Sequence, residues 1–344
     1  MPRIDENFLD CVFYIYPSQQ DAIHGEKIGG CGFFVSIKSK DIPSLTHLYA
    51  VTNAHVIRQS NTIVLRVNLK DEAKGFETIQ TENRKWIYHP DGDDVAVYHL
   101  IGSITNDFKI FSIGISVFAS DTIVETLKLG PGDEVFMIGR FVNHEGKQRN
   151  LPTVRFGNIA MMPIEPVIMP KTGIRQESFI VEVRSLPGYS GSPVFWYIPD
   201  FSRRPGSSRL EARPYRGLLG IDAGHFESKI LITDSKGEAH PDKWQASLNS
   251  GMAIIVPAWK ILELLNSEDV EAGMDNWEKE TIKVAHQINS EYEEILKQLD
   301  SQDIPEEHRE ENQRRMAQIG VSLRRWLGEK GEVRDDDAGD RANG

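Results

Sequence analysis

Short stretches in which apolar and polar residues alternate recur along residues 8–256 of the chain. The clearest is 61–68, where Ile63, Leu65 and Val67 alternate with polar neighbours. A period of two predicts strands that bury one face, and short strands separated by turns predict an all-β barrel architecture. The predicted strands of a first lobe are 8–16, 28–37, 48–52, 61–68, 86–89 and 95–100. Those of a second lobe are 122–127, 133–138, 153–162, 178–183, 193–197, 215–222 and 252–256, with a boundary between the lobes at about 102–120.

The pattern changes to helical spacing near the end of these strands. Residues 259–265 predict one short helix. Beyond residue 266, apolar residues recur every three or four positions among Glu, Lys and Gln, which is typical of an amphipathic helix. A second helix is predicted to begin near Asp303 and Pro305. We therefore divide the chain into 1–266, a helical extension over 267–330, and a disordered tail over 331–344. The extension is expected to pack on the barrels, on a regulatory protein partner, or on a second copy of the chain.

Composition narrows the classes of function. The formal net charge of -12 argues against nucleic-acid binding. No run of 18 apolar residues is present, so no membrane span or membrane partner is expected. The first residues lack the apolar core of a signal peptide. Cys11 and Cys31 have no metal-ligand spacing, and we expect two buried free thiols in a cytoplasmic protein with no cofactor and no metal.

Residues 187–193, with the sequence Pro-Gly-Tyr-Ser-Gly-Ser-Pro, have the composition of a nucleophile turn. A serine hydroxyl needs a base to take its proton and donors to hold the oxyanion that forms. The glycines beside Ser190 allow the backbone to bring N–H groups close to a substrate carbonyl. The alternative is a surface turn, which Gly, Ser and Pro also favour.

Two other stretches carry the residue types that such a serine requires. His55 lies in a turn of small residues at the end of an apolar strand, and Asp94 directly precedes the strand 95–100. The order His, Asp, Ser differs from that of the subtilisins and of the α/β-hydrolases. Ser192 also stands where the hydrolase pattern G-x-S-x-G requires its last glycine.

Together, Thr-Asn-Ala-His55, Asp94-Val-Ala-Val and Gly188-Tyr-Ser190-Gly-Ser-Pro resemble the three signatures of trypsin-like serine peptidases with the chymotrypsin fold. The resemblance spans about residues 8–266 and is nearest to the bacterial, disulfide-free branch. It implies an all-β fold of two six-stranded antiparallel β-barrels, followed here by an α-helical C-terminal extension. It also implies a serine endopeptidase whose cleft lies between the lobes and whose partner is a protein or peptide substrate.

The resemblance assigns roles to individual residues. Ser190 would be the nucleophile, His55 the base and Asp94 the acid that orients it, with the N–H groups of Gly188 and Ser190 as the oxyanion hole. Asp93 is the alternative to Asp94, and Ser192 the alternative to Ser190. A second reading of the whole pattern is a catalytically silent protease fold that serves as a binding module or scaffold.

Departures from the family limit what else the resemblance implies. Tyr189 stands where animal members carry an aspartate that binds a newly cleaved N-terminus, so no zymogen cleavage is expected. The segments that bind substrate in relatives match Arg184, Ser185, Asp222, Ala223, Gly224 and His225. Asp222 stands where glutamyl endopeptidases carry a histidine. Two roles for Asp222 therefore stay open: it could favour a basic side chain in the substrate, or it could form a structural ion pair with Arg184.

His89 and His99 are interpreted as structural. Residues 201–216 form a basic segment, interpreted as a solvated loop or as a docking loop for an acidic segment.

Overall fold

The structure is a computed structural model that describes most of the chain. The described residues are 3–27, 29–42, 45–58, 60–102, 104–144, 146–170, 173–199, 215–233, 238, 242, 244–300, 308, 309, 312 and 314–316. Most of the basic segment, the expected start of the second helix and the tail beyond residue 331 lie outside these residues.

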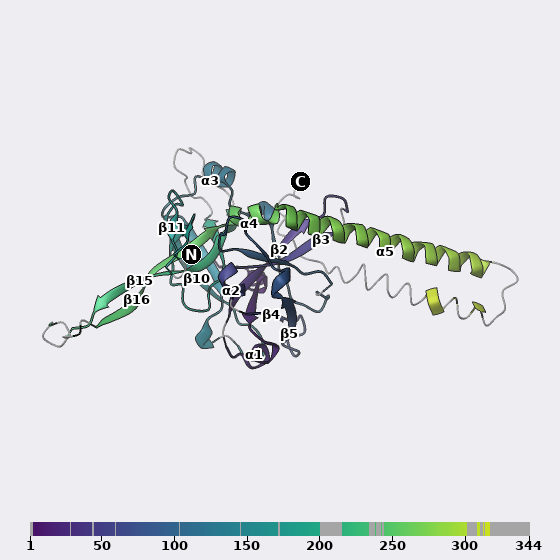
Figure 1. Ribbon diagram of the computed structural model, residues 1–344, viewed down its shortest axis with the longest axis horizontal. Helices are drawn as coiled ribbons and strands as arrows, with labels where there is room; N and C mark the ends of the chain where they lie inside the picture. Colours follow the sequence, from purple (N-terminus) through teal and green to yellow (C-terminus); the bar gives the residue numbers. More distant parts are fainter. Residues whose placement is uncertain are drawn as a thin grey trace.

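The first lobe is one open sheet of eight strands (Figure 1). The strands pair in the order β5-β4-β1-β2-β3-β7-β6, and β8 pairs in parallel with β2. Strands β2 and β3 lie in the middle because their β-branched and aromatic residues are buried on both faces. The strands are β1 (Val12–Tyr16), β2 (Gly30–Lys38), β3 (Thr46–Thr52), β4 (Thr62–Asn68), β5 (Phe76–Glu82), β6 (Ile87–Tyr88), β7 (Ala96–His99) and β8 (Ile113–Gly114).

The expectation of a closed first barrel is wrong. Within the described part of the chain, β5 pairs only with β4, and β6 pairs only with β7. Side chains occupy the gap between these edges. The Trp86 indole N–H donates to Thr81 Oγ1 (2.9 Å), and the Trp86 ring lies 5.4 Å from that of Tyr98. Packing of a large aromatic side chain therefore replaces the ladder of backbone hydrogen bonds that closes a barrel.

The second lobe is a closed six-stranded barrel, as expected. Its strands follow one another in the order β10-β13-β16-β15-β14-β9. A two-stranded sheet of β11 (Val167–Ile168) and β12 (Arg175–Gln176) lies outside this barrel. The barrel strands are β9 (Glu134–Gly139), β10 (Thr153–Met161), β13 (Phe179–Glu182), β14 (Pro193–Ile198), β15 (Tyr215–Leu231) and β16 (Gln245–Pro257).

Two predicted strands are helical instead. Residues 122–127 belong to helix α3 (Asp121–Leu127), because Ser120 caps its first turn by accepting the Ile123 N–H (3.3 Å). The first part of the predicted strand 8–16 is a 3-10 helix (Glu6–Cys11), in which Asp5 accepts the Asn7 N–H (3.0 Å). In both cases a capping side chain outweighed the strand preference of the residues that follow.

Buried cation–π contacts join the two lobes. Arg140 follows β9, and its guanidinium lies 5.1 Å and 4.4 Å from the ring centroids of Tyr14 and Tyr16 in β1. All three side chains are fully buried. Desolvation strengthens such contacts, so they fix how the second lobe sits on the first.

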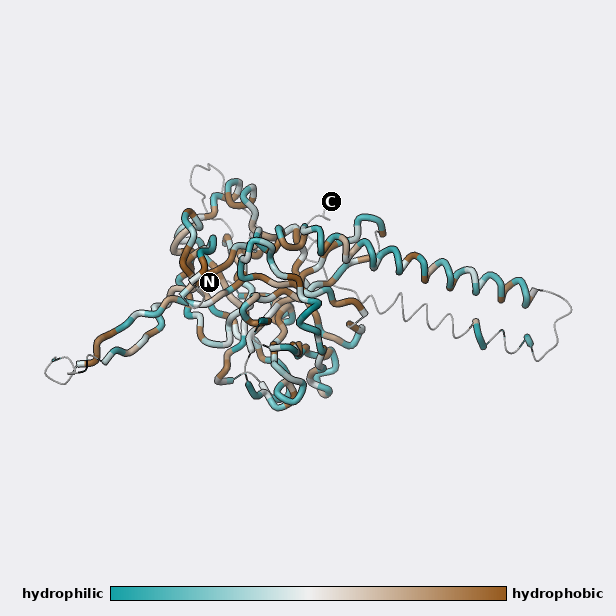
Figure 2. Tube along the Cα trace, viewed as in Figure 1, coloured by the Kyte–Doolittle hydropathy of each residue, from teal (hydrophilic) through white to brown (hydrophobic). Residues whose placement is uncertain are grey.

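The helices follow the second barrel along the chain. Helix α4 (Ala258–Leu265) packs on the barrel, and α5 (Glu268–Asp300) runs from the body into solvent (Figure 1). The projecting part of α5 is mainly hydrophilic (Figure 2). Of the described residues beyond α5, Arg315 pairs with Glu291 of the helix (2.9 Å). No helix among the residues described is both long and apolar enough to cross a bilayer.

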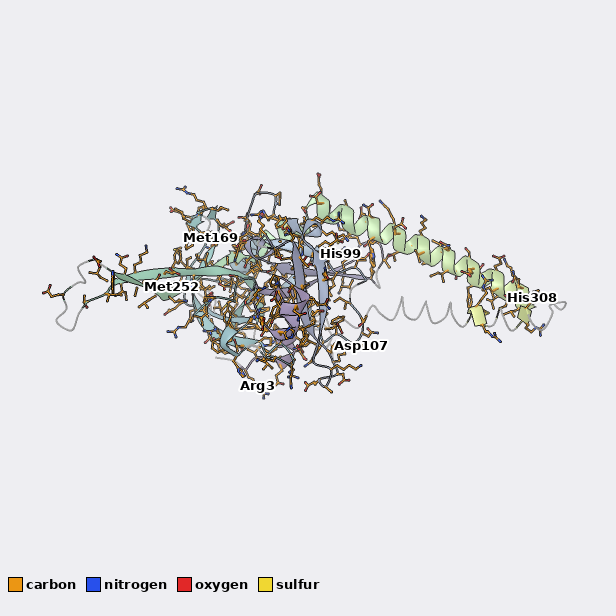
Figure 3. The ribbon with its side chains drawn as sticks, turned by 60° about the horizontal axis from the view of Figure 1, so that its bottom comes forward. Arg3, His99, Asp107, Met169, Met252 and His308 are labelled. Carbon is orange, nitrogen blue, oxygen red and sulfur yellow. The ribbon has the colours of Figure 1, made fainter. Side chains whose placement is uncertain are left out.

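A buried polar contact attaches α5 to the first sheet. His47 Nε2 lies 2.6 Å from Glu278 Oε1, and His47 Nδ1 lies 3.1 Å from His99 Nε2. His99 also stacks on Tyr49, with 4.5 Å between ring centroids. Figure 3 labels His99 close to the start of the helix. Burial, with a smaller contribution from the charge of His47, lowers the pKa of His99 to about 3.

This lowered pKa predicts loss of stability in mild acid. An unfolded histidine binds a proton below about pH 6.5, whereas folded His99 stays neutral down to about 3. The stabilisation is therefore complete above about pH 6.5 and is lost as the pH falls toward 3, by at most about 1.4 kcal/mol per pH unit. His99→Phe keeps the ring stacking and should flatten the dependence of the unfolding free energy on pH, measured by denaturant titration. The same change at exposed His286 should leave the slope unaltered, and equal slopes in all three proteins would contradict the assignment.

Candidate active site

His55 lies on α2 (Ala54–Ile57), a single helical turn after β3. Its side chain is 19% exposed and that of Asp94 is 13% exposed. Asp94 Oδ2 lies 2.6 Å from His55 Nδ1, and Asp94 Oδ1 accepts the backbone N–H of His55 (2.8 Å). One carboxylate therefore holds both the ring and the backbone of the histidine, which fixes the rotation of the ring and directs Nε2 away from Asp94.

Two amide side chains hold the backbone of Asp94. Asn53 Nδ2 donates to the Asp94 carbonyl oxygen (2.9 Å), and the Asp94 N–H donates to Gln176 Oε1 (3.2 Å). Gln176 is buried and lies on β12, which follows strand β10 of the second lobe along the chain. Gln176 therefore helps to position Asp94, which belongs to the first lobe. Sequence reasoning missed Gln176, because a lone glutamine in a two-residue strand carries no pattern.

Asp93 faces a different cluster. Its Oδ2 lies 3.4 Å from His89 Nδ1 and 3.5 Å from Lys260 Nζ, and Lys260 also pairs with Glu263 (2.9 Å). His89, Asp93 and Glu263 are close enough to bind one metal ion. The ammonium of Lys260 already supplies a positive charge there. Burial lowers the pKa of Lys260, but the hydrogen bond to Glu263 and the charges of Asp93 and Glu263 raise it overall. The cluster is thus an ion-pair contact between the Asp94 loop and α4.

The turn that carries Ser190 has two glycines with left-handed backbone. Gly188 has φ +94° and Gly191 has φ +89°. A Cβ on Gly191 would overlap the Cys31 carbonyl oxygen and the Thr52 hydroxyl, so only glycine fits there. Ser190 is partly exposed, whereas Ser192 is fully buried against Gly139 and cannot reach a substrate.

The N–H groups of Gly188 and Ser190 donate to no acceptor among the described residues. The N–H of Gly191 is used, because it donates to the Asp222 carbonyl oxygen (2.9 Å). Two unbonded donors on one tight turn, beside a partly exposed hydroxyl, form a suitable binding place for an oxyanion.

Cys31 connects the serine turn to the histidine segment. Its N–H donates to the Ser190 carbonyl oxygen (2.8 Å), and its own carbonyl accepts from Thr52 Oγ1 (2.6 Å), three residues before His55. Both cysteines are free and buried, as expected. Burial, only partly offset by the charge of Arg140, raises the pKa of the Cys31 thiol to about 11. The thiol therefore stays protonated at neutral pH and is a poor nucleophile.

Tyr189 anchors the same turn inside the barrel. Its hydroxyl lies 2.6 Å from Thr153 Oγ1 and accepts from Arg155 Nε (2.7 Å), and the Arg155 guanidinium lies 4.7 Å from its ring. The phenol thus has polar partners within the barrel. The turn is held without a carboxylate beside the serine.

The six residues predicted to bind substrate separate into two groups. Ser185 and Asp222 come together and are buried, with Ser185 Oγ donating to Asp222 Oδ2 (2.7 Å). Arg184 is exposed and takes part in no ion pair recorded in the described structure. Ala223 is buried, Gly224 has φ +143°, and His225 is partly exposed. Asp222 also ties its strand to the serine turn, because its N–H donates to the Ser192 carbonyl oxygen (2.9 Å).

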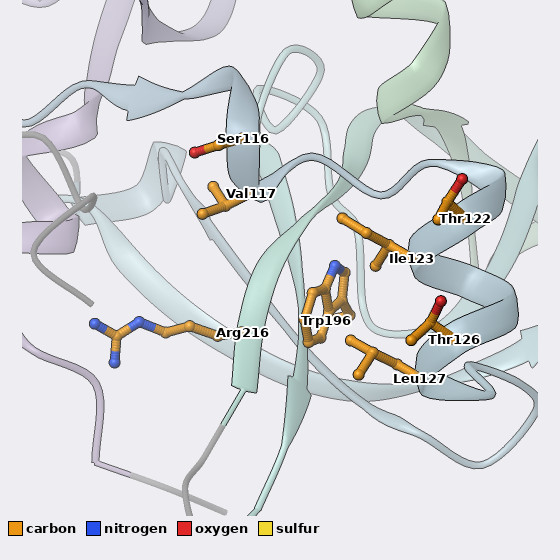
Figure 4. Close-up of a pocket in the computed structure, with 8 residues that line it drawn as sticks. All are labelled: Ser116, Val117, Thr122, Ile123, Thr126, Leu127, Trp196 and Arg216. Carbon is orange, nitrogen blue, oxygen red and sulfur yellow. The ribbon is translucent and has the colours of Figure 1, made fainter. Parts of the chain in front are cut away.

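A pocket of about 390 Å³ lies elsewhere, on the outside of the second barrel. Figure 4 shows Trp196 between Val117, Ile123 and Leu127 in its wall. None of the lining residues belongs to the His55, Asp94 and Ser190 group, so this pocket is separate from the candidate site.

One contact of a catalytic triad is not formed. Within the described part of the chain, no hydrogen bond joins Ser190 Oγ to His55 Nε2. The two segments are nevertheless adjacent, since a Cβ on Gly30 would lie 2.8 Å from the Ser190 carbonyl oxygen and 3.1 Å from the Val56 side chain. Such nucleophile–base contacts are often long in structures without substrate and shorten when it binds.

Comparison with known proteins gives no family assignment. The chain matches no protein-family model and none of the curated protein sequences. Among solved structures, it is similar to the MamO protease domain from Magnetospirillum magneticum, at 15% identity over 76% of this chain and 99% of that one, with a TM-score of 0.44. It is also similar to an inactive mutant of Rv3671c from M. tuberculosis H37Rv, at 14% identity over 75% and 86%, with a TM-score of 0.38. Such low values say nothing about the chemistry of this chain, which rests on its own residues.

Proposed function

We propose that this protein is a serine endopeptidase of the trypsin-like family, with His55, Asp94 and Ser190 as its triad. The observation that carries the proposal is the double contact of Asp94, whose two oxygens bind the ring Nδ1 and the backbone N–H of His55 at 2.6 Å and 2.8 Å. A carboxylate in this position keeps the Nδ1 proton in place and leaves Nε2 as the base. An aspartate that served packing alone would not need both contacts.

The proposed reaction proceeds through an acyl-enzyme. Ser190 Oγ attacks the carbonyl carbon of the scissile bond while His55 Nε2 takes the hydroxyl proton. The oxyanion that forms accepts hydrogen bonds from the N–H groups of Gly188 and Ser190. His55 then gives its proton to the leaving amine as the C–N bond breaks. Water, deprotonated by the same imidazole, attacks the ester and regenerates Ser190. Asp94 stabilises the imidazolium formed in each half-reaction.

Labelling with a fluorophosphonate tests this function directly. The reagent forms a covalent phosphonate ester only with a serine that an adjacent base activates. We expect wild-type protein to be labelled at Ser190, as identified by mass spectrometry of the modified peptide, and Ser190→Ala to remain unlabelled. Ser192→Ala is the matched control in the same turn, because the buried Ser192 hydroxyl cannot reach the reagent. Wild-type protein that is folded but unlabelled would contradict the proposal.

The absent bond between Ser190 and His55 favours one alternative, a silent protease fold that binds peptides without cutting them. The two functions differ in their products. Mapping of new N-termini in an unfolded protein mixture should yield cleavage sites with wild-type protein and none with Ser190→Ala. Binding of peptides by both proteins, without new termini from either, would support the alternative.

A further inference from the structure

Strands β15 and β16 leave the barrel together as a two-stranded ribbon that projects into solvent (Figure 1). The pairing of β15 with β14 ends at Pro193↔Ile221, whereas its pairing with β16 continues to Leu231↔Gln245. From residue 223 onward, the other edge of β15 pairs with no strand in the described structure. The sequence pattern predicted that this strand would end at residue 222, so the ribbon is a feature that only the structure reveals.

The ladder register identifies which backbone groups face this open edge. Hydrogen-bonded and non-hydrogen-bonded pairs alternate along an antiparallel ladder. The N–H of Ile232 donates to the Trp244 carbonyl oxygen (2.8 Å), so Ile230↔Ala246 is also a hydrogen-bonded pair. The N–H and C=O groups of the intervening residues Lys229 and Leu231, and likewise of Glu227, therefore point away from β16. They are spaced for another strand.

The ribbon also has one apolar face. Residues opposite one another in a ladder share a face. Ile230, Ile232, Trp244 and Leu248 lie on the same face and are 50%, 42%, 54% and 49% exposed. The other face is mainly polar, with Glu227, Lys229 and Ser247, and carries one exposed apolar side chain, that of Leu231. Figure 2 shows hydrophobic stretches along this arm. A lone two-stranded ribbon is marginally stable, and large exposed apolar side chains in a cluster mark an interaction surface.

The open edge begins at the candidate active site. Asp222 exchanges backbone hydrogen bonds with the serine turn, accepting from Gly191 and donating to Ser192, both at 2.9 Å. The next residue, Ala223, is the first on the open edge. From there to Leu231 the strand runs about 26 Å at ordinary strand rise. The ladder to β16 is irregular between Asp222 and Gly224 and again between His225 and Glu227, so the regular part of the edge is 227–231 and a peptide that also reaches Ser190 follows the bend of β15.

We propose that the open edge of the ribbon, residues 227–231, binds an unfolded segment of the substrate as an added antiparallel strand, upstream of the residues that the segment 222–225 binds in relatives. This inference rests on the endopeptidase function proposed above. β15 runs away from Ser190, so an antiparallel peptide runs toward it, and the bound segment precedes the bond that is cut. Side chains at alternate positions of that segment pack on Ile230 and Ile232. The substrate class is therefore an extended chain with apolar residues at alternate positions upstream of the cleavage site.

The test compares long and short substrates on matched ribbon variants. A peptide cleaved in a digest of unfolded protein is synthesised with four and with ten residues before the scissile bond. Lys229→Pro removes an N–H that faces the open edge and spares the ladder to β16. Ser247→Pro is the matched control, because Ser247 lies opposite Lys229 and its N–H faces the outer edge of β16. Lys229→Ala controls for the loss of the lysine charge. Fluorophosphonate labelling of Ser190 and thermal melting report the state of the site and the fold.

Wild-type protein, Ser247→Pro and Lys229→Ala should cleave the long peptide with a kcat/KM about tenfold or more above that of the short one. Lys229→Pro should lose this advantage while keeping its labelling rate and its activity on the short peptide. N-methylation of the long peptide at alternate upstream amides gives a readout that needs no protein variant. Methylation of the amides that face the β15 edge should lower cleavage about as much as Lys229→Pro does. Methylation of the amides between them, which face away from the edge, should not.

Equal cleavage of long and short peptides by labelled wild-type protein would overturn this inference and leave the endopeptidase function standing. Equal effects of both N-methylated sets would overturn it in the same way. A dimer in light scattering that Lys229→Pro dissociates would show that the ribbon binds a second copy of the chain instead. Failure of folded wild-type protein to label would overturn both proposals.

Discussion

Ser190→Ala and His55→Ala should each reduce kcat for peptide cleavage by about 10⁴- to 10⁶-fold, and the double variant should be little worse than either alone. The reason is that the hydroxyl is a nucleophile only while the imidazole takes its proton, so removal of either partner removes the whole step. Kinetics on one cleaved peptide, with the four proteins of the double-mutant cycle, measure this. Thermal melting should show all four folded, since Ser190 is partly exposed and His55 is 19% exposed.

The double variant discriminates between a triad and two unrelated residues. Losses that multiply, so that the double variant is slower than either single variant by a further factor of about 10⁴ or more, would mean that the residues act independently. Ser192→Ala serves as the control, and it should retain kcat within about threefold, because its hydroxyl lies buried against Gly139.

Asp94→Asn should reduce kcat by about 10⁴-fold while leaving the fold intact. The backbone N–H of His55 donates to one oxygen of Asp94 at 2.8 Å, so the oxygen of an asparagine must stay there. Its NH₂ group then faces His55 Nδ1. That nitrogen must become an acceptor, and the ring proton moves to Nε2, which can no longer take the proton of Ser190. The geometry thus predicts that the His55 ring keeps its position but carries its proton on the wrong nitrogen.

Asp93→Asn is the matched control for this prediction. Asp93 adjoins Asp94 but contacts His89 and Lys260, so its loss should alter stability more than kcat. Nitrogen-15 NMR of the His55 ring in Asp94→Asn would report the proton on Nε2. Similar losses of kcat in Asp93→Asn and Asp94→Asn, or a ring with its proton still on Nδ1, would contradict the role given to Asp94.

The helical extension has a definite place in the fold. The sequence left open whether it would cover the barrels or another chain, and the structure shows that its first turns pack on the first sheet through Glu278, His47 and Trp277. Beyond this contact, α5 carries exposed Ile282, Val284 and Leu296. Light scattering of the full chain distinguishes the two partners that the sequence allows: the mass of a dimer would indicate a second copy, and the mass of a monomer would leave these side chains for a regulatory protein.

Local patterns in the sequence determined much of this protein. Alternation of apolar residues predicted most of the strands, because a half-buried sheet surface requires a period of two. The close spacing of glycines around Ser190 predicted a tight turn, and Gly188 and Gly191 have left-handed backbone in it. The order of His55, Asp94 and Ser190, each beside a predicted strand, indicated the chemistry before any distance was known. These features are local, so neighbouring residues in the chain suffice to specify them.

Features that depend on partners distant in the chain were decided only by the tertiary structure. The helical turns at 121–127 and 6–11 are an exception, because their caps Ser120 and Asp5 lie within three residues of the N–H groups that they accept. The first lobe stays an open sheet whose end strands β5 and β6 do not pair, which no pattern within either segment reveals. Gln176 reached the Asp94 backbone from 82 residues away. The extension of β15 beyond residue 222 followed from its pairing with β16, since a strand ends where its partner ends and not where its own alternation fades. Long-range pairing therefore formed the open edge that we propose as a substrate surface, while local sequence supplied the three residues proposed as the triad.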